Sequence, residues 1–235
     1  MFFADRITKI KSDYKVLEIG PGSHPHHRSD VFLELNYNSE EDKIAQFGHS
    51  EELVTNKKII FYDGTKFPIS DNEFDYVICS HVLEHVPDVN LFLSEIFRVS
   101  KYGGYFEYPL ITYDYLYNFN VHLNFLKFDG KSLFVMKKTA TPLDFFKPIH
   151  TFFNHTLNNG YSDILTKLPD NFFQGFEWEE PFKVIESNDI KDFLVYQIDK
   201  SADNSNQHTV SYTLKLLLFL IKNKIISAFK NKTQK

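Results

Sequence analysis

Acidic, glycine and small polar residues end four short apolar runs within the first 81 residues of this 235-residue chain. Carboxylates accept hydrogen bonds from hydroxyl and amine groups, and glycines let a ligand approach the backbone closely. Together these groups are suited to binding a nucleoside. In chain order, they are Gly20 and Gly22, Glu34, Asp63 and Gly64, and Ser80 and His81.

Each position has its own expected role. Because glycine lacks a Cβ, the chain can turn sharply after the first run and a ligand can close on the backbone. Glu34 can accept both ribose hydroxyls, as the acid of nucleotide-binding sheets does. Asp63 is placed to accept an adenine amine, while Gly64 exposes a backbone N–H. We expect Ser80 and His81 to lie beside the reacting end of the ligand.

The runs that carry these residues predict a parallel sheet. Between the fourth and fifth runs, Asp88 is the expected N-cap of a helix with one apolar face, which Gly103 stops. Strand, helix and strand imply a right-handed parallel crossover. We therefore predict a Rossmann-like, doubly wound α/β fold with a cofactor-binding core over residues 1–109. The five predicted strands are 15–20, 31–35, 58–62, 74–80 and 104–109.

The remainder of the chain predicts three further parts. Residues 110–180 are rich in aromatic side chains and follow strand five, where open α/β folds place ligand-covering elements, so we predict a substrate lid. An elaborated core subdomain is the alternative. Within 181–200, the runs 182–186 and 193–198 are predicted to pair as closing strands of the core sheet.

The last part, residues 201–235, predicts a basic amphipathic helix. Such a helix can lie on an anionic membrane surface, which makes peripheral membrane contact through 214–235 one hypothesis. Packing onto the protein body or a partner chain is the favoured alternative. The sequence does not fix the oligomeric state.

The composition limits the cellular compartment and the kinds of partner that we expect. The only cysteine, Cys79, allows no intrachain disulfide, and a reducing cytoplasm is the simplest compartment. No apolar stretch approaches the roughly 20 residues that span a bilayer, so we expect a soluble or peripheral protein. The net charge of −5 argues against electrostatic tracking of nucleic acid.

Residues 14–109 resemble the type 11 group of class I S-adenosylmethionine-dependent methyltransferases. The resemblance rests on VLEIGPG at 16–22, DG at 63–64, SHVLEHV at 80–86 and RVSKYGG at 98–104. It implies S-adenosylmethionine as cofactor and methyl transfer as the reaction; a hydroxyl of a saccharide or other small metabolite is the expected acceptor. The cofactor contacts that it implies are Glu18, Gly20, Gly22, Glu34, Asp63 and Ser80.

One feature departs from the family. Only eight residues separate Gly22 from Val31, too few for the usual long first helix. We therefore expect a proline-bearing loop over 23–30, and no helix N-terminus there to help bind the cofactor.

Histidines are the expected catalytic groups. A hydroxyl acceptor must lose a proton, and His85 or His122 can take it near neutral pH. We predict no metal site. His24 and its neighbours lack a supporting carboxylate or cysteine. The pattern His81-x-x-Glu84-His85 matches an inverted zinc-peptidase motif, but a proline truncates that helix and no third ligand is evident.

Two alternative functions differ in what they require of the sequence. A nicotinamide-dependent oxidoreductase would need Gly-x-Gly-x-x-Gly, and Pro25 stands where the third glycine should be. A catalytically silent cofactor-binding or scaffold protein, whose aromatic insertion binds a partner, stays open as the alternative to an enzyme.

Overall fold

The structure is a computed structural model of the whole chain. Contacts divide the chain into one unit at Met1–Leu194 and a second at Val195–Lys235. The second unit, with the predicted amphipathic helix, lies outside the described residues. The structure describes residues 1, 3–37, 39, 53, 55–117, 119–138 and 169–189, together with Thr151, His155, Leu165, Asp192 and Phe193.

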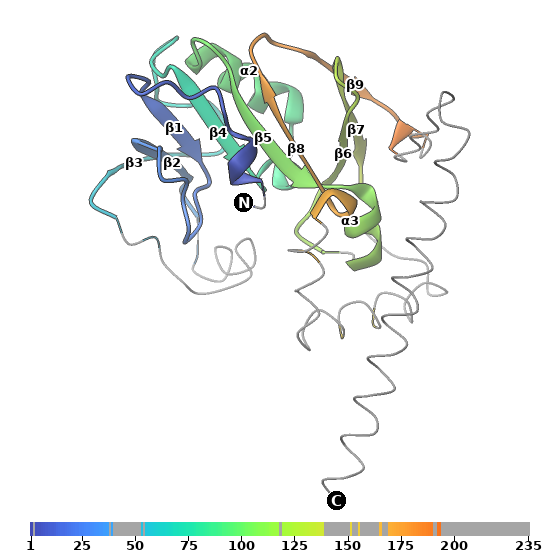
Figure 1. Cartoon of the computed structure of the whole chain (residues 1–235). Coiled ribbons are helices and arrows are strands. Elements are labelled where there is room, and N and C mark those ends of the chain that lie inside the picture. Colours follow the sequence, from blue (N-terminus) through green and yellow to red (C-terminus); the bar gives the residue numbers. More distant parts are fainter. Residues whose placement is uncertain are drawn as a thin grey trace, which may run out of the picture. The chain divides into compact units, whose positions relative to one another are not determined.

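A six-stranded sheet forms the centre of the first unit, in the order β3-β2-β1-β4-β5-β8 (Figure 1). The first five of these strands are parallel, and β8 pairs antiparallel with β5. The predicted Rossmann-like α/β fold with a mostly parallel sheet is therefore confirmed. The strands are β1 (Val16–Ile19), β2 (Val31–Leu35), β3 (Lys58–Tyr62), β4 (Tyr76–Ser80), β5 (Gly104–Pro109) and β8 (Phe173–Trp178).

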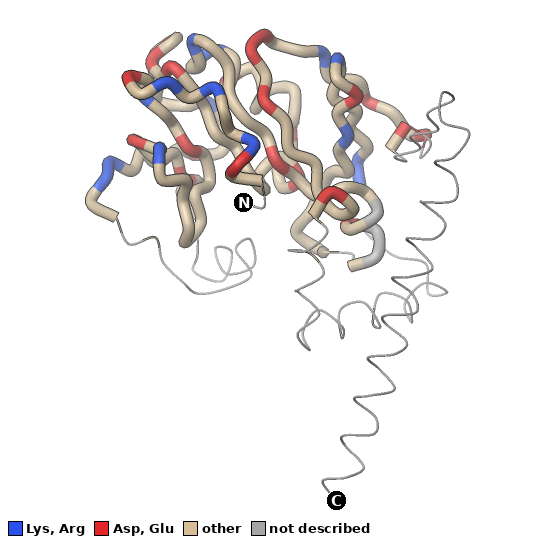
Figure 2. Tube along the Cα trace, in the orientation of Figure 1, with Lys and Arg blue, Asp and Glu red and all other residues tan. Residues whose placement is uncertain are grey.

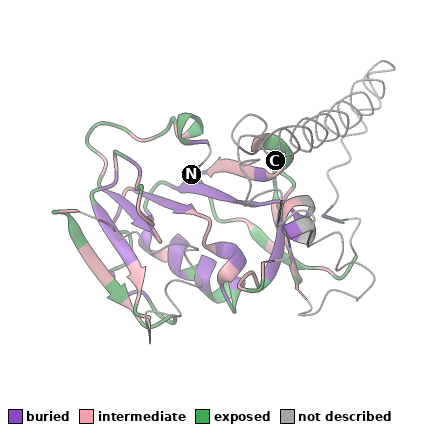
Figure 3. Ribbon diagram, turned by 90° about the horizontal axis from the view of Figure 1, so that it is seen from below, coloured by how far each residue is buried: buried purple, intermediate pink, exposed green. Residues whose placement is uncertain are grey.

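Helix α2 (Val89–Val99) packs against this sheet. Its N-cap is Asp88, as predicted, and the Asp88 side chain accepts a hydrogen bond from the Leu91 backbone N–H at 2.9 Å. The apolar face of α2 joins strand residues such as Leu17 and Phe106 in the main core. Figure 3 shows the buried residues concentrated along the central strands and on α2. All residues of β1 and β5 are buried, which explains why both strands are mainly apolar apart from Glu18 and Glu107.

A smaller sheet contains β6 (Asn124–Phe128), β7 (Ser132–Lys137) and β9 (Lys183–Glu186). The prediction that residues 182–186 close the core sheet is wrong, because β9 pairs in parallel with β7. The free edge of β5 is already occupied by β8 through six residue pairs. Of the second predicted closing strand, only Phe193 is described, and it lies in a turn.

The predicted insertion contributes to both sheets. Its described elements are the 7-residue helix α3 (Ile111–Tyr117), the β6–β7 hairpin, the 3-10 turn η5 (Pro169–Asn171) and β8. Since β8 belongs to the core sheet, the predicted insertion boundary at residue 180 is too late. Residues 139–150, and most of the residues from 152 to 168, lie outside the described residues. Whether the insertion covers a substrate stays a prediction.

Charged residues of both signs are spread along the described chain (Figure 2). Two ion pairs fasten the N-terminal segment beside β8: Arg6 to Asp170 at 2.6 Å and Lys9 to Glu179 at 2.5 Å. The segment begins near the buried Phe3 and includes the short 3-10 turn η1 (Ala4–Arg6). Among the described residues, no helix has the length and apolarity needed to cross a membrane.

Candidate functional site

A cavity of about 1300 Å³ lies at the carboxyl ends of β1 to β4. Parallel pairing in register aligns these ends along one edge of the sheet. Residues from distant parts of the sequence therefore share one space. All ten residues singled out from the sequence line this cavity: Glu18, Gly20, Gly22, Glu34, Asp63, Gly64, Ser80, His81, His85 and His122.

The bend after β1 needs its glycines for two reasons. Gly20 and Gly22 both have φ of +59°, in the left-handed region that side chains with a Cβ rarely adopt. A Cβ on Gly20 would lie 2.6 Å from Cγ2 of Val82, whereas a Cβ on Gly22 would have no heavy atom within 4 Å. Gly20 thus lets two segments pack closely, and Gly22 leaves open space at the cavity wall.

The loop over 23–30 replaces a first helix, as the sequence predicts: the structure has no helix between β1 and β2. Glu18 holds this loop. Its Oε2 accepts hydrogen bonds from the His26 backbone N–H at 2.9 Å and from the Ser29 hydroxyl at 2.5 Å. Burial raises the pKa of Glu18 to about 6, although these two hydrogen bonds oppose the rise. Because one oxygen is committed to the loop, Glu18 shapes the cavity wall; its predicted direct contact with a cofactor stays a prediction.

Glu34 and Asp63 lie at the carboxyl ends of two neighbouring strands. Glu34 lies near the end of β2 and is half-buried, and its Oε1 accepts a hydrogen bond from the Leu35 N–H at 3.0 Å. Asp63 follows β3 and is exposed, and its Oδ1 accepts from both the backbone N–H (3.0 Å) and the hydroxyl (2.5 Å) of Thr65. These bonds lower the pKa of Asp63. Two carboxylates thus face one cavity from one sheet edge, the arrangement that their predicted roles require.

Ser80 and His81 converge on a carboxylate that the sequence analysis did not single out. Glu107 of β5 is almost fully buried. Its Oε1 lies 3.2 Å from the Ser80 hydroxyl, which donates to it, and 3.0 Å from Nε2 of His81. Its Oε2 accepts from the Phe3 N–H at 3.0 Å and from the Tyr105 hydroxyl at 2.8 Å. Glu107 therefore ties the end of β4 to β5 and to the N-terminal segment.

His81 is strained and charged. Its φ of +57° is unusual for a residue with a side chain. Its backbone N–H donates to the Glu107 carbonyl at 2.7 Å, which helps to hold this conformation. Burial lowers the pKa of His81, but the hydrogen bond to Glu107 and the nearby carboxylate of Glu84 outweigh burial and raise the pKa to about 9. At neutral pH, the imidazole of His81 is thus a cation at the cavity wall.

The two histidines predicted to be catalytic lie next to each other. His85 belongs to the 3-10 turn η2 (Leu83–His85), and His122 lies just before β6. Their ring centroids are 4.6 Å apart and the rings are nearly perpendicular. Since η2 is a single 3-10 turn, the α-helix that the zinc-peptidase pattern would require does not form. His81 contacts Glu107 rather than sharing a helix face with His85.

Asn124 explains how His122 reaches η2. This buried side chain of β6 donates to the Leu83 carbonyl at 3.1 Å and to the Val86 carbonyl at 2.7 Å. The Leu123 N–H also donates to the Glu84 carbonyl at 2.7 Å. The chain entering β6 is therefore fixed along η2, and His122 is held over His85.

The roles of three acids near these histidines were not predicted from the sequence: Glu84, Glu107 and Asp114. Each is buried. A single acid within an otherwise apolar run, as in GYFEYP at 104–109, is a signal that could have identified Glu107. The pairing of Asp114 with His122 had no comparable signal, because it depends on how α3 and the turn before β6 fold.

Comparison with known proteins adds an independent observation. Residues 19–107 match the family described as a methyltransferase domain. A demethylmenaquinone methyltransferase of Listeria monocytogenes serotype 4a (strain HCC23) is 32% identical over 87 residues, which are 37% of this chain and 34% of that protein. The ubiquinone/menaquinone biosynthesis C-methyltransferase UbiE of Rickettsia prowazekii (strain Madrid E) is 35% identical over 78 residues, 33% of this chain and 29% of that protein.

The chain thus spans about a third of the length of these curated relatives. Among solved structures, a SAM-dependent methyltransferase from Aquifex aeolicus is 18% identical, with a TM-score of 0.32 over 46% of this chain and 63% of that chain. The family match extends from the last residue of β1 to Glu107 in β5 and includes most of the cavity residues. Residues 19–107 thus match the methyltransferase-domain family, which agrees with the resemblance of residues 14–109 to class I S-adenosylmethionine-dependent methyltransferases.

Proposed function

We propose that this protein transfers a methyl group from S-adenosylmethionine to a hydroxyl of a saccharide or another small metabolite. The observation that carries the proposal is the cavity itself. Five separate segments of a methyltransferase-family chain bring ten residues, chosen for their chemistry, to one space. Convergence of this kind is what a bound ligand requires, and packing alone does not require carboxylates and imidazoles to face the same opening.

The cavity fits the cofactor at several points. The Gly20 to Gly22 bend would receive the methionine part, where a Cβ on Gly22 would fill the open space. Glu34 would accept the ribose hydroxyls, and Asp63 the adenine amine. Ser80 and His81 would lie beside the sulfonium. When bound, S-adenosylmethionine supplies an electrophilic methyl group.

The remaining space suits an acceptor. The volume of about 1300 Å³ exceeds the ~300–1,000 Å³ of common single-ligand pockets. The part of the lining beyond the cofactor residues contains Tyr113, Phe119 and Phe173 with His85 and His122. Aromatic faces can stack on a sugar or other flat ring, while the imidazoles can bind its hydroxyl groups. This combination supports a polar acceptor that carries a ring.

The protein's work in this reaction is alignment. The acceptor oxygen must lie in line with the methyl carbon and sulfur in a space that excludes water. The hydroxyl must also lose its proton. The sequence predicts His85 or His122 as the base, and that role stays a prediction.

Calorimetry tests the cofactor. Titration with S-adenosylmethionine should give a binding heat that fits one site per chain. Titration with NAD should give no binding heat. Glu34→Ala should weaken binding of S-adenosylmethionine at least about tenfold, since a hydrogen bond to a charged group contributes about 1.5–3 kcal/mol. Asp170→Ala is the matched control, because it removes an exposed carboxylate outside the cavity. Absence of S-adenosylmethionine binding would overturn the proposal.

An acceptor panel separates an enzyme from the silent cofactor-binding alternative. Transfer of a labelled methyl group should be measured with saccharides and small phenols. Demethylmenaquinone belongs in the panel because relatives carry its name. Cofactor binding with no transfer to any member would favour the silent scaffold, and transfer only to a quinone carbon would contradict the hydroxyl acceptor.

A further inference from the structure

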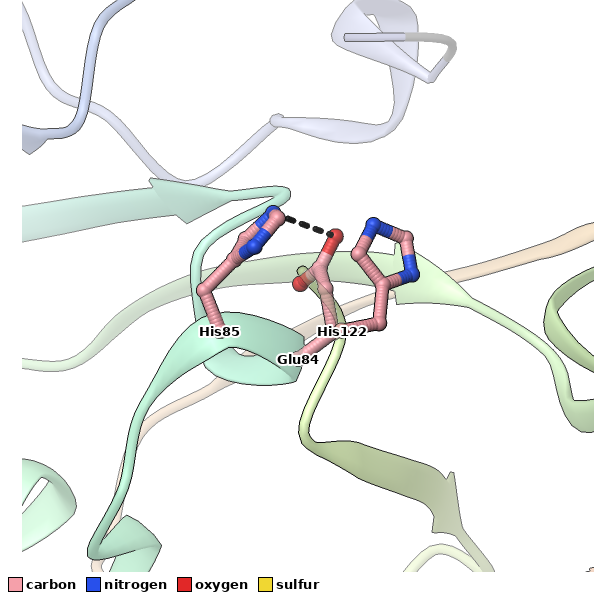
Figure 4. Close-up of side chains that lie close together, drawn as sticks. All are labelled: Glu84, His85 and His122. Atoms are coloured by element: carbon pink, nitrogen blue, oxygen red, sulfur yellow. Dashed lines mark ion pairs between the residues drawn. The ribbon is translucent and has the colours of Figure 1, made fainter. Parts of the chain in front are cut away.

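Three ligand-type side chains meet at the acceptor end of the cavity. Glu84 and His85 come from η2, and His122 comes from the turn before β6. One ligand atom from each lies within 4.8 Å of the other two. Figure 4 shows the three side chains directed toward one another.

Glu84 lacks the donors that a buried carboxylate needs. Its side chain is only 1% exposed, and among the described residues neither of its oxygens accepts a hydrogen bond. Nδ1 of His81 is 3.4 Å and Nε2 of His85 is 4.0 Å from Oε1, distances of ion pairs only. Burying a carboxylate in this way costs several kcal/mol unless a cation or donors compensate. The His81 imidazolium, 3.4 Å away, gives part of that compensation, and a positively charged ligand between Glu84, His85 and His122 would add to it.

The two imidazoles are oriented as metal ligands are. Nδ1 of His85 lies 3.2 Å from the Val121 carbonyl oxygen, which can only accept, so Nδ1 carries the proton and Nε2 keeps its lone pair. Nδ1 of His122 pairs with Oδ1 of Asp114. Metal-binding histidines commonly donate one ring N–H to a carbonyl or a carboxylate while the other nitrogen binds the ion. Here both histidines have such a partner.

We propose that Glu84, His85 and His122 form a binding site for one divalent transition-metal ion. Two imidazole nitrogens and one carboxylate suit zinc, iron, cobalt or manganese. With metal–ligand bonds of about 2.0–2.2 Å, ligand atoms lie roughly 3–3.5 Å apart, so the side chains need to approach by about 1.5 Å. Since all three residues line the cavity, positions opposite them stay open to water or acceptor. The site departs from the expectation that this chain binds no metal.

The consequence for catalysis rests on the proposed function. An acceptor hydroxyl bound to the ion would lose its proton to solvent more readily, because the ion stabilises the oxygen anion. That oxygen would form the new bond to the methyl carbon as the carbon–sulfur bond breaks and its electron pair goes to sulfur. His85 and His122 would then act as ligands rather than as bases. Such a site favours an acceptor with a hydroxyl group, with or without a second oxygen next to it that also binds the ion.

Metal titration of the full chain tests the proposal without any cofactor or acceptor. Protein stripped with a chelator is titrated separately with Zn²⁺, Co²⁺ and Mn²⁺, and binding is followed by calorimetry and, for Co²⁺, by visible absorption. We expect one equivalent of Zn²⁺ or Co²⁺ to bind. The double variant His85→Ala/His122→Ala should lose at least about 100-fold in affinity, and Asp114→Asn about 10–100-fold.

One control variant and one conservative ligand variant complete the test. His24→Ala removes another cavity imidazole, in the loop over 23–30, and should bind the metal as the wild type does. Glu84→Gln preserves side-chain volume and should lose affinity while folding normally, as judged by circular dichroism. Failure of Zn²⁺, Co²⁺ and Mn²⁺ all to bind the wild type, or equal binding by the double variant, would overturn the metal site. Because S-adenosylmethionine binding is measured separately, either proposal can fail alone.

Discussion

Gly20 and Gly22 allow a prediction at the level of single residues, because they share one φ and differ in their surroundings. Gly22→Ala should cost about 1–2 kcal/mol of unfolding free energy, from the left-handed conformation alone. Gly20→Ala should cost more, since its Cβ would also collide with Val82. Denaturant unfolding of both variants measures the difference. Equal losses would show that the close contact with Val82 is not as described.

Glu18 gives a pH-dependent prediction. Its pKa is about 6 in the folded protein, mainly because of burial, against 4.5 as the ordinary value. The folded state thus binds this proton more tightly than the unfolded state. The resulting stability is fully present below pH 4.5 and is lost as pH rises through 6, a change of about 2 kcal/mol.

The matched variant for this prediction is Glu18→Gln, which keeps an acceptor for His26 and Ser29 but cannot titrate. We expect the stability of wild type relative to Glu18→Gln to fall by about 2 kcal/mol between pH 4.5 and pH 7. Free energies of unfolding from urea titrations at several pH values give this difference. A difference that does not change with pH would mean that Glu18 is not buried as described.

Residues at the carboxyl ends of the parallel strands were easier to predict from the sequence than the buried acids that pair with other segments. Glu34, Asp63 and Ser80 could be found because strand ends of a parallel sheet meet at one edge. Glu107 and Asp114 could not be assigned partners, since their partners come from other segments of the chain. Glu84 was part of a sequence pattern, but its approach to His122 depends on β6. Their roles depend on the N-terminal segment, on β6 and on α3, whose placement no local pattern indicates.

The link between η2 and β6 gives a prediction at the level of elements. Asn124→Ala would remove the donors to the Leu83 and Val86 carbonyls and leave both buried oxygens without that partner. We expect a loss of about 2–4 kcal/mol of unfolding free energy. Metal affinity should also fall, because His122 would no longer be held over His85. Thermal unfolding and metal titration measure the two effects.

Asn90→Ala is the control for that variant, because Asn90 is exposed on α2. It should change stability by less than about 0.5 kcal/mol and leave metal affinity unchanged. If Asn124→Ala behaved like Asn90→Ala, β6 would not depend on Asn124 for its position along η2.

Some helices and strands were easier to predict from the sequence than others. The five parallel strands and α2 were predicted because continuous apolar runs and an apolar helix face have clear periods. The β9 segment was recognised as a strand but assigned to the wrong sheet, since an apolar run does not specify which edge it joins. The β8 segment was missed because Gly175 and polar residues interrupt its apolar pattern.

For the whole molecule, cofactor binding should stabilise the fold. A ligand that binds only the folded state at 100 times its Kd adds about 2.7 kcal/mol. We therefore expect S-adenosylmethionine to raise the Tm by several degrees at saturating concentration, and NAD to leave it unchanged. Differential scanning calorimetry measures both. A similar Tm shift with both ligands would indicate a site that does not distinguish S-adenosylmethionine from NAD.

If the proposed function is correct, the cavity at the carboxyl ends of β1 to β4 holds one adenosyl cofactor. A crystal structure with S-adenosylhomocysteine, the product of methyl transfer from S-adenosylmethionine, tests it most directly. We expect the ribose hydroxyls to lie at Glu34, the adenine amine beside Asp63 and the amino-acid part against the Gly20 to Gly22 bend. A ligand bound outside this cavity, or a ribose far from Glu34 with protein atoms filling the cavity, would contradict the proposed cofactor site.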